Sequence, residues 1–162
     1  MGTINVYTDG SCLGNNPGSG GWAVIFNLKE GLKKISGNAS PTTNNRMELI
    51  AVLEALKEID RLRREPNDAY VIYSDSAYVV NAINNGWLKK WRKNGWLTSK
   101  GEEIKNKSLW CKVYVKLSIL FDAGISVQIK KVKGHSGNTF NELADKLARE
   151  RSLEISNKNI GE

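Results

Sequence analysis

Apolar residues alternate with polar ones in the first third of this chain and recur at helical spacing further on. Five segments predict strands: residues 3–9, 22–28, 33–39, 69–75 and 125–132. A glycine-rich stretch at 14–21 interrupts the first pair. The segment 69–75 (AYVIYSD) is apolar almost without a break, as expected of a strand that is covered on both faces.

The longest helical pattern follows the third predicted strand. Its apolar side chains recur at helical spacing as Leu49, Val52, Leu53, Leu56 and Ile59. Together with the cap-type residues TTNN before them, they predict a helix over about 45–64. Three more helices are predicted over 76–84, about 102–122 and 138–153. The resulting order, βββαβααβα, predicts an α/β fold with a five-stranded mixed sheet flanked by helices.

Length and composition indicate one globular domain in a reducing compartment. The chain has 162 residues, and we expect residues 1–153 to form the domain and 154–162 (EISNKNIGE), which lack an apolar stripe, to be disordered. No apolar run approaches the roughly 20 residues that span a bilayer. Cys12 and Cys111 are too far apart for a CxxC redox motif. We therefore expect a cytoplasmic monomer that does not bind membranes.

Positive charge is concentrated in one segment. The formal net charge is +7, which alone is weak evidence for a polyanionic partner. Between Trp87 and Lys100, however, basic residues occur without any acidic one: Lys89, Lys90, Arg92, Lys93 and Lys100. They alternate with Trp87, Trp91 and Trp96, whose ordinary role is packing. Lysines between aromatic residues more often face water, where they suit phosphate groups.

Two acidic residues stand where apolar strand patterns end. Asp9 precedes the glycine-rich stretch, and Asp75 closes the segment AYVIYSD. In sheets of this type, ligands gather where strands end at a switch in chain order. We therefore expect the two carboxylates to lie close together, with the glycines allowing a bulky polyanion to approach the backbone.

The other acidic candidates, and Asp75 itself, also have structural interpretations. Glu48 fits a capping box with Asn45, or it points over the edge of the sheet. Asp75 can cap the next helix. Asp145 lies beside a buried stripe and can pair with Arg149 one turn later.

Taken together, the acids favour a metal site. Clustered carboxylates repel one another, and divalent cations remove that penalty. Mg²⁺ prefers carboxylate and water ligands, and two ions roughly 3.5–4 Å apart stabilise both reacting oxygens in phosphoryl transfer. His135, the only histidine, stands between two glycines in VKGHSGN. It is either incidental or a proton shuttle near the leaving group.

These residues resemble type I ribonuclease H in six stretches that follow one another in the family's order. The stretches are YTDGSCLGN (7–15), TTNNRMEL (42–49), YSDSAYVVNAI (73–83), NGWLKKWRKNGW (85–96), VKGHSG (132–137) and NELADKLA (141–148). The resemblance implies a ribonuclease H-like fold. It also implies a catalytic domain over 1–153 that hydrolyses the RNA strand of RNA–DNA hybrids and leaves 5′-phosphate and 3′-hydroxyl ends.

The resemblance also implies roles for individual residues. Two Mg²⁺ ions, with Mn²⁺ as an alternative, would be held by Asp9, Glu48, Asp75 and Asp145, and His135 would assist catalysis. Positions matching substrate contacts are Asn15, Asn16, Thr43, Asn44, Asn45, Ser76 and Asn106, of which Thr43 and Asn106 match a phosphate pocket on the DNA side. A basic protrusion at about 85–101 would grip the DNA strand through Trp87, Lys89, Lys90, Trp91, Arg92 and Lys93. Glu48, Asn44 and Asn45 are the expected contacts to the 2′-hydroxyl that distinguishes RNA from DNA.

The sequence departs from the family pattern in three places, and two other functions remain open. Asn15-Asn16 stands where the family commonly has one Asn, Leu143 replaces a frequently polar residue, and 66–68 lengthens a loop.

The first alternative function is that of an integrase-like or resolvase-like relative that acts on DNA, although such relatives lack KGHSG and NGWLKKW at this spacing. The second is a basic hybrid-binding module whose acids only cap helices.

Overall fold

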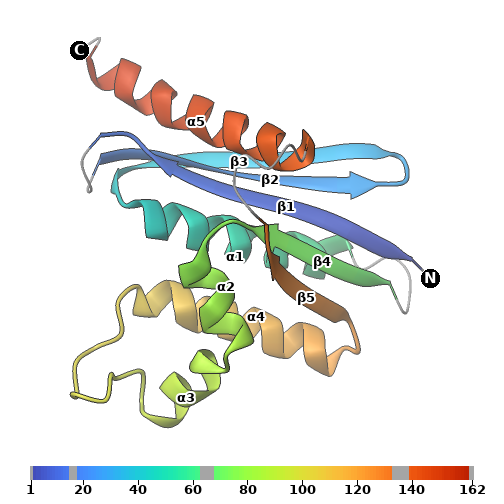
Figure 1. Ribbon diagram of the computed structural model, residues 1–162, viewed down its shortest axis with the longest axis vertical. Helices are drawn as coiled ribbons and strands as arrows, with labels where there is room; N and C mark the ends of the chain where they lie inside the picture. The colour runs from blue at the N-terminus through green and yellow to red at the C-terminus, as the bar shows by residue number, and fades with distance from the viewer. Residues whose placement is uncertain (1, 15–17, 63–67, 133–138, 161–162) are drawn as a thin grey trace.

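The fold is a five-stranded mixed sheet with helices on both faces (Figure 1). The computed structural model describes residues 2–14, 18–62, 68–132 and 139–160. Its elements are β1 (Thr3–Cys12), β2 (Gly18–Leu28), β3 (Gly31–Thr42), α1 (Asn44–Leu62), β4 (Ala69–Ser74), α2 (Ala77–Asn84), α3 (Trp87–Lys93), α4 (Lys107–Asp122), β5 (Ser126–Lys131) and α5 (Thr139–Ile160). The strand order is β3-β2-β1-β4-β5, antiparallel from β3 to β1 and parallel from β1 to β5. This confirms the fold class predicted from the sequence.

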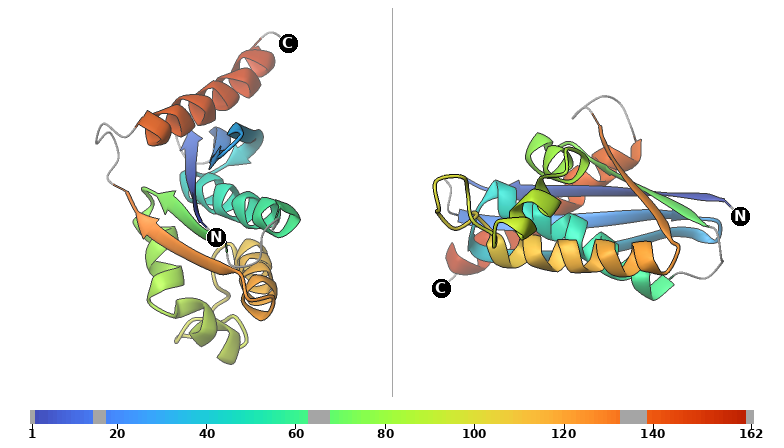
Figure 2. Two further views of the ribbon diagram at one scale, coloured as in Figure 1. Left: turned by 90° about the vertical axis from the view of Figure 1, so that its right-hand side faces the viewer. Right: turned by 90° about the horizontal axis from the view of Figure 1, so that it is seen from below.

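Two hydrophobic clusters hold the layers together. Helix α5 packs on one face of the sheet, and α1 packs on the other, with α4 against α1 (Figure 2). The cluster on the α1 face includes the predicted stripe of that helix and the fully buried Trp110. The cluster under α5 joins Tyr7 and Ile25 to the predicted stripe of that helix: Phe140, Leu143, Ala144 and Leu147. Leu143, which departs from the family pattern, is thus a packing residue.

The first two strands continue further into the glycine-rich stretch than the sequence predicted. Their ladder extends to the pairs Ser11↔Gly21 and Cys12↔Gly20, so Asp9 lies inside β1 rather than at its end. A Cβ atom on Gly21 would lie 2.3 Å from the carbonyl oxygen of Ala148 in α5. Gly20 and Gly21 therefore serve close packing inside the protein, and our interpretation that they interrupt the strand is wrong.

The predicted helices also need three corrections. The segment after Gly86 forms a separate helix, α3, which the predicted order omitted, and α4 begins at Lys107 rather than near 102. Helix α5 runs on to Ile160, beyond the end at 153 that the sequence predicted. The first helix-breaking residue after Thr139 is Gly161, and an ion pair of 2.6 Å joins Arg151 to Glu154, the first residue beyond the predicted end of the helix.

Within the described ranges, no helix is long and apolar enough to cross a membrane.

Gly10 allows α1 to approach β1 closely. A Cβ atom at this position would lie 2.3 Å from the backbone nitrogen of Glu48 and 2.4 Å from the carbonyl carbon of Met47. Both contacts are to backbone, which cannot move aside as the end of a flexible side chain can. The start of α1 is therefore fixed against the middle of β1, next to Asp9.

We predict that Gly10→Ala lowers the free energy of unfolding by about 1–3 kcal/mol, because the added methyl group overpacks the β1–α1 contact. Urea denaturation measures the change. Gly2→Ala is the matched control, since nothing lies within 4 Å of a Cβ atom there. Equal stabilities for the two variants would contradict the close approach.

Candidate metal centre and substrate surface

The register of the two central strands brings Asp9 and Asp75 together. The parallel ladder between β1 and β4 ends at the pair Tyr7↔Tyr73, whose rings stack 5.1 Å apart. Asp9 and Asp75 each come two residues after a member of this pair. They therefore occupy equivalent positions beyond the point where the strands separate, as the sequence predicted for two acids at one edge.

Glu48 reaches the same point from α1, and it does not form the capping box considered for it. The helix is capped by Thr43, whose Oγ1 accepts a hydrogen bond of 3.2 Å from the backbone N–H of Arg46. Glu48 lies further along, in the next turn, and is only 5% exposed. Its Oε1 accepts a hydrogen bond from the backbone N–H of Gly10. The close approach at Gly10 thus holds this carboxyl against β1.

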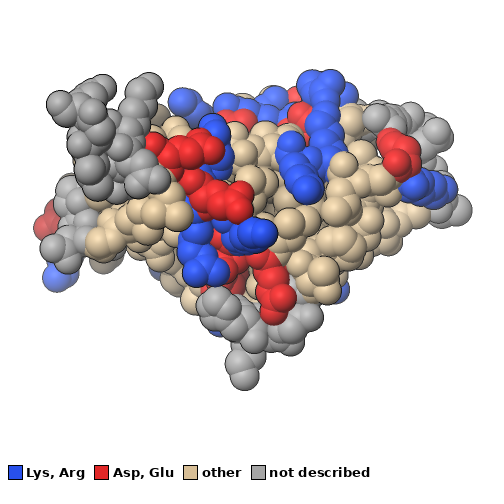
Figure 3. Space-filling view, turned by 90° about the horizontal axis from the view of Figure 1, so that it is seen from above, with Lys and Arg blue, Asp and Glu red and all other residues tan. Residues whose placement is uncertain are grey.

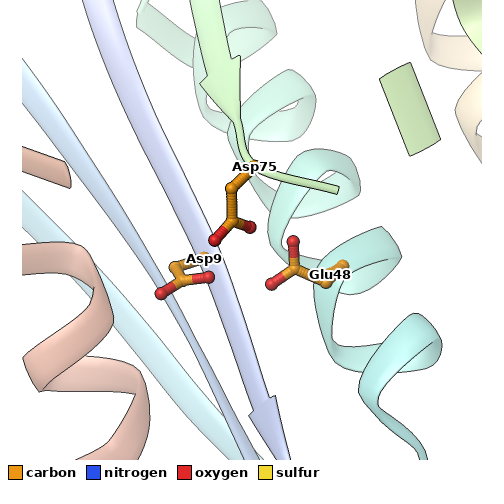
Figure 4. A group of neighbouring side chains, drawn as sticks. All are labelled: Asp9, Glu48 and Asp75. Atoms are coloured by element: carbon orange, nitrogen blue, oxygen red, sulfur yellow. The ribbon is translucent and has the colours of Figure 1, made fainter. Parts of the chain in front are cut away.

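Asp75 is likewise not a helix cap. The N-cap of α2 is Ser76, whose Oγ accepts a hydrogen bond of 3.2 Å from the backbone N–H of Val79. The Asp75 carboxyl turns instead toward Asp9 and Glu48 (Figure 4). One carboxylate oxygen from each of these three residues lies within 4.8 Å of the others. Three elements distant in sequence thus supply one cluster.

Asp145 forms the ion pair considered for it in the sequence, and it also lies near Asp9. Its Oδ2 accepts a hydrogen bond of 2.7 Å from Nη2 of Arg149, the expected pair one helical turn apart. It also interacts with Asp9 across the gap between α5 and β1, where its charge and a hydrogen bond raise the pKa of Asp9. The fourth acid therefore stands beside the cluster of three.

Burial makes the charged state of this cluster unfavourable. It raises the pKa of Asp9 to about 7, against a hydrogen bond with Glu48 that lowers it, and the negative charge of Asp75 raises it further. Burial also raises the pKa of Glu48 well above its usual range, with the charge of Asp9 as the next cause. Near neutral pH, ionising all of these carboxyls therefore costs free energy unless a cation is bound.

The donor set fits a hard divalent cation. The Oε2 atom of Glu48 is buried and has no hydrogen-bond partner among the described residues. A buried carboxylate oxygen without a donor is costly unless a cation contacts it. The cluster supplies carboxylate oxygens only, the ligands that suit Mg²⁺ and Mn²⁺ and not the softer metals.

The expected substrate contacts gather around the start of α1. Asn44 and Asn45 are exposed in its first turn. Arg46 links Thr43 and Asn106, because its backbone N–H donates to Oγ1 of Thr43 and its Nη1 donates a hydrogen bond of 3.2 Å to Oδ1 of Asn106. Arg46 is not among the site residues predicted from the sequence, since an arginine near a helix start gives no signal of its own. Asn15, Asn16 and His135 lie outside the described residues.

In the basic protrusion the tryptophans pack on one another and on the core, with Trp87 still exposed at the rim, and the cations face outward. Trp91 of α3 packs edge-on against the buried Trp110 at 5.5 Å, and Trp87 packs against Trp91 at 6.1 Å. The cations of the helix are all exposed: Lys89, Lys90, Arg92 and Lys93. Elsewhere, on the face viewed from the α5 side, basic and acidic side chains are intermixed (Figure 3).

Comparison with known proteins identifies the family. The RNase H family model matches residues 1–152. A Ribonuclease H of Syntrophomonas wolfei is 48% identical over 149 residues, covering 92% of this chain and 95% of the relative. One of Chlorobaculum parvum is 49% identical over 150 residues, covering 91% of this chain and 93% of the relative. The chain belongs to the ribonuclease H family.

Solved structures agree with this assignment. The crystal structure of LC9-RNase H1, described as a type 1 RNase H with the type 2 active-site motif, has a TM-score of 0.77 at 30% identity, covering 94% of this chain and 72% of that one. A foamy viral protease-reverse transcriptase in complex with RNA/DNA hybrid has a TM-score of 0.76 at 27% identity, covering 92% of this chain and 20% of that one. The predicted resemblance to ribonuclease H is confirmed, and with it the assignment to nuclease enzymes.

The raised pKa values predict a stability that depends on both pH and Mg²⁺. Without metal, folded Asp9 keeps its proton up to pH about 7, whereas the unfolded chain loses it near its ordinary value of 3.8. The folded state therefore binds more protons between these values, and stability falls as the pH rises through them. At pH 8, Mg²⁺ at a hundredfold excess over its Kd should add about 2.7 kcal/mol, or roughly 5–10 °C in Tm.

Differential scanning fluorimetry with and without EDTA measures this effect. At pH 5 the Mg²⁺ shift should be much smaller, because protons compete for the carboxylates. Asp9→Asn should lose the shift, and the control Glu102→Gln, an exposed acid remote in sequence, should keep it. A shift of equal size at both pH values, or one retained in Asp9→Asn, would disprove the assignment.

Proposed function

We propose that this protein is an endonuclease that hydrolyses the RNA strand of RNA–DNA hybrids and leaves 5′-phosphate and 3′-hydroxyl ends. The observation that carries the proposal is the convergence of three carboxyls, two of them buried, from β1, α1 and the residue that follows β4. A protein that merely bound polyanions would gain nothing from clustered negative charge. Family membership supplies the substrate class, and a cytoplasmic, monomeric state stays a prediction.

The proposed metal ligands are the four acids Asp9, Glu48, Asp75 and Asp145. Two bound Mg²⁺ ions would polarise the scissile phosphate and lower the pKa of the attacking water. The protein's own part is to fix the carboxylates before substrate arrives. The backbone N–H of Gly10 does this for two of them, since it donates to Oδ1 of Asp9 at 2.9 Å and to Oε1 of Glu48.

His135 is proposed to move a proton near the attacking water or the leaving group. Its ordinary pKa lies close to neutrality, so the ring can both accept and release a proton under working conditions. The chain enters α5 shortly after this residue, and Asp145 lies on that helix. The proposal for His135 rests on this position in the sequence and on the family resemblance.

Selection of RNA requires a contact to the 2′-hydroxyl. The exposed amides of Asn44 and Asn45 stand at the start of the helix that carries Glu48. The minor groove of an A-like duplex is wide and shallow, so short polar side chains at a helix start can reach it. We propose that these residues read the RNA strand, with Ser76, Asn15 and Asn16 as further contacts.

Selection of the DNA strand is assigned to a separate surface. Thr43 and Asn106 are proposed to bind a phosphate of that strand, and the exposed cations of α3 further phosphates. The side chain of Arg46 lies against Asn106 and adds positive charge there. Contacts of this kind contribute affinity and position the duplex, while the 2′-hydroxyl contacts decide which strand is cut.

Cleavage assays separate this function from the two alternatives. The substrates are a labelled RNA–DNA hybrid, duplex DNA and duplex RNA, each with Mg²⁺ and with EDTA. The proposal requires Mg²⁺-dependent cuts in the RNA strand of the hybrid only. Cleavage of duplex DNA would favour an integrase-like or resolvase-like relative, and binding without cleavage would favour a hybrid-binding module.

We predict that Asp9→Asn lowers the cleavage rate by about 10³-fold or more, because it removes a central metal ligand and several kcal/mol of transition-state charge stabilisation. The variant should stay folded by circular dichroism and still bind the hybrid. Single-turnover kinetics with labelled hybrid measure the rate. Glu102→Gln again serves as the control, and a variant that retains most of the wild-type rate would contradict the metal assignment.

A second prediction concerns α3. Replacing Lys89, Lys90, Arg92 and Lys93 with Ala should raise KM far more than it lowers kcat, because these cations bind phosphates away from the reacting one. Each lost contact should flatten the log–log salt dependence of binding by up to about 0.9. Hybrid affinity over a salt series measures this slope, and the cuts should stay confined to RNA.

The control for α3 lies on the β2–β3 hairpin. Lys29 and Lys34 are exposed there, at the opposite end of the molecule from α3 (Figure 1). Replacing both with Ala removes positive charge but should leave the salt slope unchanged. Parallel slopes for wild type and the α3 variant would show that its cations are only a solvated face.

A further inference from the structure

One tyrosine hydroxyl lies at the centre of the polar contacts between α1, α2 and α4. The hydroxyl of Tyr78, in the first turn of α2, accepts hydrogen bonds from Nδ2 of Asn106 at 3.2 Å and from Nε1 of Trp110 at 2.9 Å. Trp110 is completely buried, and its ring meets that of Tyr78 edge-on at 5.6 Å. A rigid core residue therefore holds the hydroxyl, and the hydroxyl holds Asn106.

The backbone of Asn106 makes this side-chain anchoring necessary. The residue precedes α4 in a left-handed conformation, with φ of 58°, and makes no side-chain cap bond to its own helix. Its amide instead bridges two other helices, accepting from Arg46 at Oδ1 and donating to Tyr78 from Nδ2. The guanidinium of Arg46, which can only donate, fixes the Oδ1 end of the amide, and the tyrosine oxygen holds the Nδ2 end toward α2.

We propose that Tyr78 is a positioning residue for the binding of the DNA strand and acts through Asn106. With the amide held in this orientation, the second N–H of Nδ2 remains to donate to a phosphate oxygen, and Oδ1 keeps the guanidinium of Arg46 beside it. Without the hydroxyl, Arg46 still holds Oδ1, but Nδ2 loses the acceptor that fixes the plane of the amide and the direction of its second N–H. The inference rests on the proposed function, in which Asn106 contacts that phosphate.

The same tryptophan also supports the basic protrusion. The ring of Trp91 in α3 packs edge-on against Trp110 at 5.5 Å. Trp110 thus contacts the anchor of Asn106 on one side and the helix that carries the four exposed cations on the other. This shared support holds Asn106 and the cations of α3 at a fixed relative position. A rigid duplex requires this if both sets of proposed DNA-strand contacts are to bind phosphates at once.

A double-mutant cycle tests the proposal. Steady-state cleavage of a hybrid is measured for wild type, Tyr78→Phe, Asn106→Ala and the double variant. Asn106→Ala should raise KM about tenfold, as expected for a lost hydrogen bond to a charged group, and Tyr78→Phe roughly threefold, as for a neutral one. With kcat nearly unchanged in both, the double variant should match Asn106→Ala alone, because Tyr78 acts only through the amide.

Controls separate positioning from general damage. Tyr114→Phe removes a hydroxyl from a half-buried tyrosine of α4, keeps the ring that lies under Arg92, and should leave KM unchanged. In ¹H–¹⁵N spectra, the indole N–H signal of Trp110 should shift in Tyr78→Phe and not in Tyr114→Phe. Independent, multiplicative effects on KM in the double variant, or an unmoved indole signal, would overturn the proposal. A wild-type protein that fails to cut hybrids at all would instead refute the proposed function.

Discussion

The cost of burying several carboxyl groups at one point is the constraint on which the rest of this structure depends. Asp9 and Glu48 are 4% and 5% exposed, and burial raises the pKa of both. A fold that served stability alone would place apolar side chains there. A bound divalent cation would offset the repulsion between the carboxylates. The fold favours such binding because it has already brought the ligands together.

Several features of the backbone exist to maintain this cluster. The parallel register of β1 and β4 sets Asp9 beside Asp75, and Gly10 lets α1 come close enough for Glu48 to reach them. Thr43 and Ser76 cap α1 and α2, so Glu48 and Asp75 are not used as helix caps and can join the cluster. The proposed substrate surface depends on the same helix, because α1 supplies Glu48 and also presents Asn44, Asn45 and Arg46 at its first turn.

The sequence predicted the layers of the fold and the meeting of Asp9 with Asp75, because both depend on local patterns. Apolar periodicity is read within one element, and Asp9 and Asp75 stand out where that periodicity stops. It could not decide between capping and metal binding for Glu48, since a shift of the N-cap from Asn45 to Thr43 changes the role of every residue in the first turns. The contact of Gly21 with α5 and the bridge from Tyr78 to Asn106 are long-range, and no spacing along the chain encodes them.

The most direct test of the account is the titration of Asp9 itself. Carbon-13 NMR of the labelled side-chain carboxyl, with Asp9→Asn used for assignment, follows this group from pH 3 to pH 9 in EDTA and in saturating Mg²⁺. We predict a titration midpoint near pH 7 without metal, because burial raises the pKa of Asp9 to about 7. With Mg²⁺ bound, the midpoint should lie far below pH 7. A midpoint near the ordinary pKa of 3.8 in EDTA, or one that Mg²⁺ leaves unchanged, would contradict the claim that the carboxyl cluster binds a divalent cation.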